Sequence, residues 1–110
     1  MSNVHWPDFP DFLPEQLKGR YQSLAPVLAE MGTLRSVDAD ALGRYLLLSW
    51  EYSATIQQVV NAIQNGDAAE SERWIAIQDR LHGQIMQLAE QFGLTPESRQ
   101  KRGLILPKDR

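Results

Sequence analysis

Cysteine is absent from the 110 residues of this sequence, and histidine occurs only twice, as His5 and His82. Without cysteine the chain can form no disulfide, no catalytic thiolate and no thiolate zinc site. The two histidines are far apart in sequence, so we expect neither a metal nor another cofactor. Gly-rich phosphate loops, nucleophile elbows and metal-binding helix motifs are missing as well. These absences predict a protein that is not an enzyme.

Long apolar runs are also missing from the sequence. No segment approaches the roughly 18 residues of an apolar membrane span, and the first residues lack the charged and apolar regions of a signal peptide. We therefore expect a soluble cytoplasmic protein with no membrane contact. With 110 residues and a mass of 12.5 kDa, the chain has enough material for one small domain.

Charge is distributed unevenly along the chain. Lys and Arg number 11 against 14 Asp and Glu, which gives a net charge of −3. Residues 99–110 hold five cations and one acid, a net of +4, which leaves −7 for residues 1–98. An acidic body with a basic end often marks an interaction arm, whereas cations beside a helix end are also typical of a solvated terminus. Both interpretations stay open at this point.

The spacing of apolar residues predicts an all-α fold. Residues 15–31 have a helical pattern, but Pro26 should split this segment into two short pieces. Two long helices should follow, one from about residue 39 to residue 65 and one from about residue 68 to residue 92. Because only a few residues around Gly66 join them, they should fold back as an antiparallel hairpin. Thr95 and Pro96 then predict the start of a short basic helix.

Three regions follow from this pattern: an extended arm rich in proline and aromatic residues at 1–14, a helical core and oligomerisation domain at 15–94, and a short basic helix with a tail at 95–110. The aromatic residues of the arm either cover helices of the same or a neighbouring subunit, or dock another protein. An apolar triplet in the tail is too close to the chain end to fold alone, so we expect it on a partner. The candidate docking residues are Trp6, Phe9, Phe12, Leu104, Ile105 and Leu106.

The long helices are apolar around more of their circumference than a single partner helix can cover. A two-helix hairpin with short flanking helices has a thin core, so the surplus apolar surface predicts a homo-oligomer. The candidate interface residues are Leu42, Tyr45, Leu46, Trp50, Tyr52, Ile75 and Met86.

Two segments carry a family resemblance. The segment 92–99 reads Phe-Gly-Leu-Thr-Pro-Glu-Ser-Arg, and Asp-Ala-Leu-Gly-Arg-Tyr at 40–45 opens the long helix that contains Trp50. With these segments in this order, the chain resembles the compact small terminase subunits of tailed phages and prophages. The resemblance implies a DNA-packaging factor in the host bacterial cytoplasm that forms a closed ring of about nine copies. It also implies that the ring binds viral double-stranded DNA at the packaging site and recruits and regulates the large terminase subunit, an ATPase and nuclease.

A ring would repeat the basic end of the chain and so create a strongly basic collar. The first candidates for DNA contact are Arg99, Lys101 and Arg102, followed by Lys108 and Arg110, with a second set of Lys18, Arg20, Arg35 and Arg44. Such cations would contact phosphates and contribute affinity rather than sequence recognition. Two alternatives stay open: a helical adaptor that binds only protein, and a small DNA-binding regulator without a packaging role.

Overall fold

The computed structural model describes residues 4–107, and every regular element in that range is helical. This confirms the all-α class. The elements are two 3₁₀ turns, η1 (Glu15–Leu17) and η2 (Ser36–Asp38), and four α-helices, α1 (Lys18–Met31), α2 (Ala39–Gln64), α3 (Ala68–Gln91) and α4 (Pro96–Arg102).

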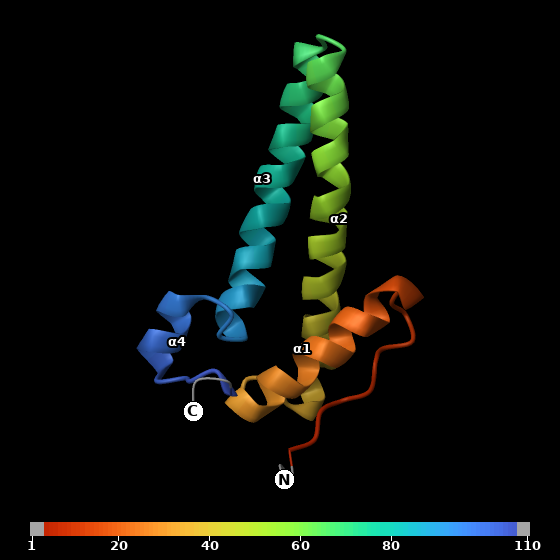
Figure 1. Ribbon diagram of the computed structural model, residues 1–110. Helices are drawn as coiled ribbons and strands as arrows, with labels where there is room; N and C mark the ends of the chain where they lie inside the picture. The colour runs from red at the N-terminus through yellow and green to blue at the C-terminus, as the bar shows by residue number, and fades with distance from the viewer. Residues whose placement is uncertain (1–3, 108–110) are drawn as a thin grey trace.

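The two long helices, α2 and α3, lie side by side and run in opposite directions (Figure 1). Gly66 lies in the short link between them with a φ of 68°, a left-handed conformation that glycine adopts without steric cost. Asp67 caps α3, because its side chain accepts a hydrogen bond from the backbone N–H of Glu70. The hairpin projects from a wider base formed by α1, α4 and the segments that flank them, so the molecule measures 55 × 32 × 22 Å (Figure 1).

The sequence prediction of two helical pieces around Pro26 is wrong, because α1 is a single helix that contains this proline. Proline removes one backbone donor and crowds the preceding turn, at a cost of about 3 kcal/mol. The helix nevertheless continues, since Ala25 and Leu28 on either side of Pro26 are fully buried in the core. Tertiary packing thus outweighs the local preference. Gly32, with a φ of 80°, ends the helix.

The hydrophobic core lies at the base of the hairpin. It is formed by side chains of the arm, η1, α1, the loop after α1, the first turns of α2 and the residue after α3, namely Leu13, Leu17, Tyr21, Ala25, Leu28, Met31, Leu34, Leu42, Leu46 and Phe92. Toward the tip, the buried side chains of α2 are only Thr55 and Ala62. The half of the hairpin near the tip therefore has little core of its own.

The N-terminal arm packs on helices of its own chain. The rings of Phe9 and Tyr21 meet edge to face, with their centroids 5.5 Å apart. The Tyr21 hydroxyl donates a 2.7 Å hydrogen bond to the carbonyl of Pro7. Burial raises the pKa of the Tyr21 phenol above its usual value of 10.0, and the Asp8 carboxylate contributes to the rise. Leu13 completes the attachment of the arm by packing over Gly43. A Cβ added at Gly43 would lie 3.0 Å from Leu13 Cδ1.

The apolar triplet of the tail also packs partly on its own chain, contrary to the expectation that it needs a partner. Leu104 and Leu106 contact the core, and only Ile105 is exposed. The reason is the turn at Gly103, which has a φ of 66° and directs the chain back toward the end of α3.

Candidate nucleic-acid and assembly surfaces

The segment from Gly93 to Arg99 forms the corner between α3 and α4. Gly93 has a φ of 71° and is buried, and the N–H of Leu94 donates a 2.8 Å hydrogen bond to the carbonyl of Ala89. Thr95 caps α4 by accepting a hydrogen bond from the N–H of Ser98, and Pro96 occupies the first turn. The sequence prediction for the start of this helix is therefore confirmed.

Two of the predicted DNA-binding arginines hold this corner together. Arg99 Nη1 donates to the carbonyl of Gly93 at 3.0 Å, and Arg102 Nη1 donates to the carbonyls of Glu90 and Gln91 at 3.3 and 2.7 Å. The last carbonyls of a helix lack partners within the helix and carry partial negative charge, so cations stabilise them. Arg102 therefore caps the C-terminal end of α3, and Arg99 binds the turn directly after it, as one of the two open interpretations of the basic segment expects.

The other predicted cations are spread over the base. Lys101 is exposed on α4. Lys18 forms a 3.9 Å ion pair with Glu15, and Arg20 and Arg44 are exposed on α1 and α2. Arg35 is exposed beside η2, and its backbone N–H donates to the Asp38 carboxylate. The remaining two candidates, Lys108 and Arg110, lie outside the described residues.

The predicted interface residues divide into two groups. Leu42 and Leu46 are fully buried within the subunit, so they present no surface to another copy. Tyr45, Tyr52 and Met86 are half-buried along the helices.

Trp50 and Ile75 from the same prediction are exposed to 44% and 42%. Sequence reasoning did not select three further exposed side chains of α2, namely Ile56, Val60 and Ile63. The signal that could have found them is the absence of any charged residue from Tyr52 to Gln64.

The predicted docking residues also divide. Phe9, Leu104 and Leu106 are packed against the core, whereas Trp6, Phe12 and Ile105 are exposed. Only these last three are free to contact a partner protein.

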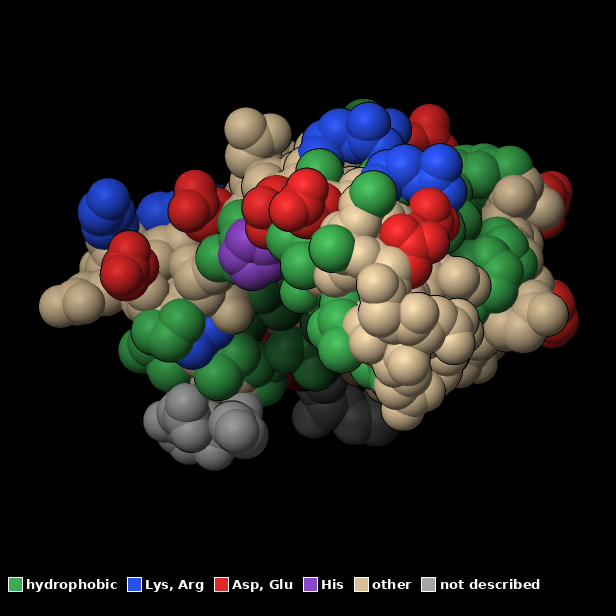
Figure 2. All heavy atoms as spheres, turned by 90° about the horizontal axis from the view of Figure 1, so that it is seen from above, with side chains coloured by type: hydrophobic (Ala, Val, Ile, Leu, Met, Phe, Trp, Pro, Cys, Tyr) green, Lys and Arg blue, Asp and Glu red, His purple; other side chains and the backbone are tan. Residues whose placement is uncertain are grey.

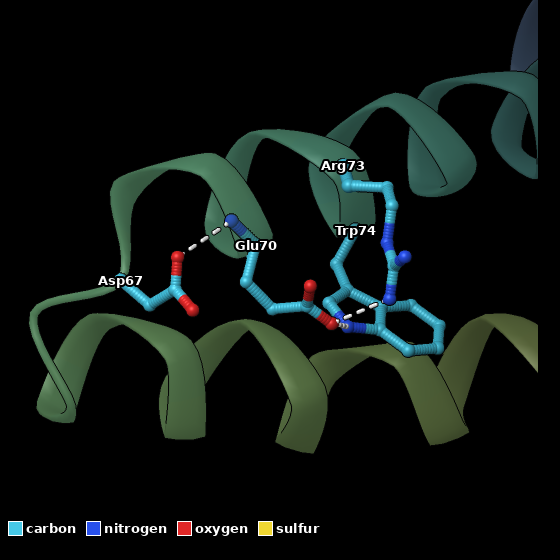
Figure 3. A network of polar contacts seen from close by, with 4 residues as sticks. All are labelled: Asp67, Glu70, Arg73 and Trp74. Atoms are coloured by element: carbon cyan, nitrogen blue, oxygen red, sulfur yellow. Dashed lines mark hydrogen bonds and ion pairs between the residues drawn. The ribbon is translucent and has the colours of Figure 1, made fainter.

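The tip of the hairpin carries a small polar network (Figure 3). One oxygen of Glu70 accepts hydrogen bonds from Arg73 Nη2 at 2.7 Å and from Trp74 Nε1 at 2.9 Å. The Arg73 guanidinium lies 5.9 Å from the Trp74 ring centroid. These contacts hold the indole, which extends from α3 toward α2, on one side of the hairpin (Figure 3). They leave this cation paired with an acid rather than open to a phosphate.

Within residues 4–107, no group of three acidic, histidine or cysteine side chains is placed to hold a metal ion. No helix of that range is long and apolar enough to cross a membrane.

Comparison with known proteins gives one finding. The model of the family described as "Phage terminase, small subunit" matches residues 18–107. The match begins at the first residue of α1 and includes the hairpin, the corner and α4. Neither the curated proteins nor the solved structures contain a match to this chain.

Proposed function

Since this chain belongs to the phage terminase small-subunit family, we propose that it is a non-enzymatic DNA-packaging factor. In this role it assembles into a closed ring, binds viral double-stranded DNA at the packaging site, and recruits and regulates the large terminase subunit. The family match over residues 18–107 is the observation that carries the proposal. The ring copy number expected from the family resemblance is about nine.

Exposed cations at the base support the DNA contact. Lys101, Arg20 and Arg44 have no ion-pair partner among the described residues. Lys101 and Arg20 lie on α4 and α1 of the base, and Arg44 lies in the first turns of α2, far from the tip (Figure 1). Each neutralised phosphate releases counterions, so the logarithm of the binding constant falls with the logarithm of salt by about 0.9 per contact. Repetition of Lys101 around a ring would multiply this effect.

Fluorescence anisotropy with labelled duplex DNA over a salt series tests the proposed contact. Lys101→Ala should weaken binding and reduce the salt slope, because it removes a phosphate contact and leaves the α3 caps intact. Arg73→Ala is the matched control, since this cation lies near the tip and is paired with Glu70. Equal salt slopes for Lys101→Ala and the parent chain would remove Lys101 from the site.

Exposed apolar side chains at the chain ends support a contact with the large subunit. Trp6, Phe12 and Ile105 are exposed to 44%, 63% and 57%, although neighbouring residues of the same segments pack on the core. Such side chains are typical anchors of a protein interface. A Trp6→Ala and Phe12→Ala double variant should reduce capture of the purified large subunit, and unchanged capture would contradict this assignment.

A further inference from the structure

The link between α2 and α3 contains a pair of residues with a chemistry of its own. Of the three asparagines in the sequence, Asn3, Asn61 and Asn65, only Asn65 is followed by a glycine. An asparagine side chain loses ammonia when the backbone nitrogen of the next residue attacks its amide carbon. Glycine has no Cβ to hinder this approach. The Asn65-Gly66 pair is therefore a candidate site of covalent modification, and the local structure determines whether it reacts.

Both residues of the pair are exposed at the tip of the hairpin (Figure 1). The side-chain amide of Asn65 has no hydrogen-bond partner within residues 4–107. Gly66 and Ser71 line a hollow of about 290 Å³ at the surface, which gives water access to the link. Figure 2 looks down on the tip and shows tan atoms of uncharged polar side chains and backbone beside acidic side chains in red. The reacting groups are thus open to the solvent that the reaction needs.

Two backbone hydrogen bonds keep the link closed. The Gly66 N–H donates to the carbonyl of Ile63 at 3.1 Å, and the Asp67 N–H donates to the carbonyl of Ala62 at 2.9 Å. The ψ of Asn65 is 0°, so the Gly66 nitrogen eclipses the backbone nitrogen of Asn65 rather than its Cβ. Attack on the side chain therefore requires a rotation about this ψ and the loss of the Gly66 hydrogen bond.

This opening of the link is local, because the tip has little core to hold it. Thr55 and Ala62 are the only buried residues in the half of α2 near the tip, and the buried residues of α3, Leu81 and Ala89, lie far from the link. The free energy of local opening ranges from near zero at exposed ends and loops to the global value in the core. We therefore expect the link to open while the base stays folded.

We propose that Asn65 is a site of spontaneous deamidation through a cyclic succinimide. In the opened link the Gly66 nitrogen gives up its proton to solvent and forms a bond to Asn65 Cγ. The bond from Cγ to Nδ2 breaks, and Nδ2 leaves as ammonia with a proton from solvent. Water then opens the ring between the Gly66 nitrogen and either Cγ, which gives aspartate, or the main-chain carbonyl carbon of Asn65, which gives isoaspartate. No oxidant or reductant is consumed.

Both products change the tip of the hairpin. Each adds one negative charge to the net charge of −3. The new carboxylate lies at the C-terminal end of α2, where the helix dipole disfavours an anion. Isoaspartate also inserts an extra carbon into the main chain of the link and so displaces the two hydrogen bonds that close it. The assignment is independent of the proposed packaging role.

Ageing of the purified chain at mildly alkaline pH tests the proposal. Trypsin releases residues 45–73 as one peptide, because this range has no Lys or Arg before its last residue. The peptide contains Asn65 and also Asn61, which is the internal control. Asn61 lies within α2, and its Oδ1 accepts a 2.9 Å hydrogen bond from Gln57 Nε2.

Three measurements follow the reaction. Tandem mass spectrometry locates the replacement of a side-chain NH₂ by OH, and a sample digested before ageing corrects for conversion during digestion. An isoaspartyl methyltransferase with labelled S-adenosylmethionine detects isoaspartate. Hydrogen exchange of the Gly66 amide, compared with that of Leu46 in the base, measures the local opening.

The mass change should appear at Asn65 and not at Asn61, and it should increase with time and with pH because the attacking nitrogen must lose its proton. Methyl acceptance should increase in parallel. The Gly66 amide should exchange faster than the Leu46 amide. Asn65→Gln is the matched variant, since it keeps the amide but needs a larger ring, and it should show neither the mass change nor methyl acceptance.

Three results would overturn the assignment. One is an Asn65 that stays unchanged in the folded chain over the time in which the chain unfolded in guanidinium chloride is converted, because the closed link then protects it. Equal conversion of Asn61 and Asn65 shows that the exposed link does not determine the site. A Gly66 amide that exchanges as slowly as the Leu46 amide shows that the link does not open locally.

Discussion

Replacing Gly93 with alanine should destabilise the subunit strongly, for two separable reasons. The φ of 71° at this corner is unfavourable for any residue with a Cβ, at about 1–2 kcal/mol. The added Cβ would also lie 2.7 Å from Leu104 Cδ1 and 3.1 Å from Met31 Cε, so these side chains must move. Such overpacking costs about 1–3 kcal/mol. The expected loss is therefore about 2–5 kcal/mol in the free energy of unfolding.

Gly103 provides the matched control for this prediction. Its φ is 66°, nearly the same as that of Gly93, but nothing lies within 4 Å of the place where its Cβ would be. Gly103→Ala should therefore show only the backbone cost of about 1–2 kcal/mol. Urea unfolding followed by circular dichroism measures both variants, at one protein concentration because assembly also contributes to apparent stability.

A third variant separates the steric contact from the backbone strain. In Gly93→Ala combined with Leu104→Ala, the clashing δ-carbon is removed, so the two changes together should cost less than the sum of the single changes. The reasoning is refuted if Gly93→Ala is no more destabilising than Gly103→Ala. It is also refuted if the two changes at Gly93 and Leu104 are simply additive.

Two further predictions concern the contacts that hold the base together. Tyr21→Phe removes the hydrogen bond to Pro7 and should lower the free energy of unfolding by about 1 kcal/mol. Amide hydrogens of the arm should also exchange faster than in the parent chain, and equal exchange rates would contradict the role of this bond. The pKa of Tyr21 is raised in the folded chain, so the protonated phenol stabilises the folded state. This contribution to the free energy of unfolding is fully present below pH 10.0 and is lost as the pH rises through the raised pKa. A pH titration that follows arm exchange should therefore show release in this alkaline range in the parent chain and no such step in Tyr21→Phe. Arg102→Ala leaves the Gln91 carbonyl at the end of α3 without its donor, while the Glu90 carbonyl keeps the Gly93 N–H. This variant should lower stability by about 1 kcal/mol, whereas Lys101→Ala should leave it unchanged in the same urea assay.

The helix ends were predictable from the sequence because they depend on residues that are close together in the chain. Left-handed glycines follow or end the helices at Gly32, Gly66 and Gly103, and Thr95 and Pro96 begin α4. These signals act through the backbone conformation of one residue or through a cap within three residues. The all-α class follows from the apolar spacing between them.

The functional surfaces were less predictable. Charge alone marked Arg99 and Arg102 as candidate DNA contacts, and it did not predict that their guanidinium groups donate to the carbonyls of Gly93 and Gln91. Apolar character alone marked Leu42 and Leu46 as interface residues, but both are fully buried inside the subunit. Residue type identifies a side chain that needs a partner, and it does not identify the partner.

The sequence by itself determined the helical class, the positions of most helix ends and the family resemblance, because each depends on local pattern. Only the tertiary structure decided that α1 continues through Pro26, that Leu104 packs over Gly93, and that Leu42 and Leu46 are buried within the subunit. These features depend on contacts between segments far apart in the chain. Such contacts can outweigh a local preference, as the buried neighbours of Pro26 do, and they determine which apolar and charged side chains are left at the surface.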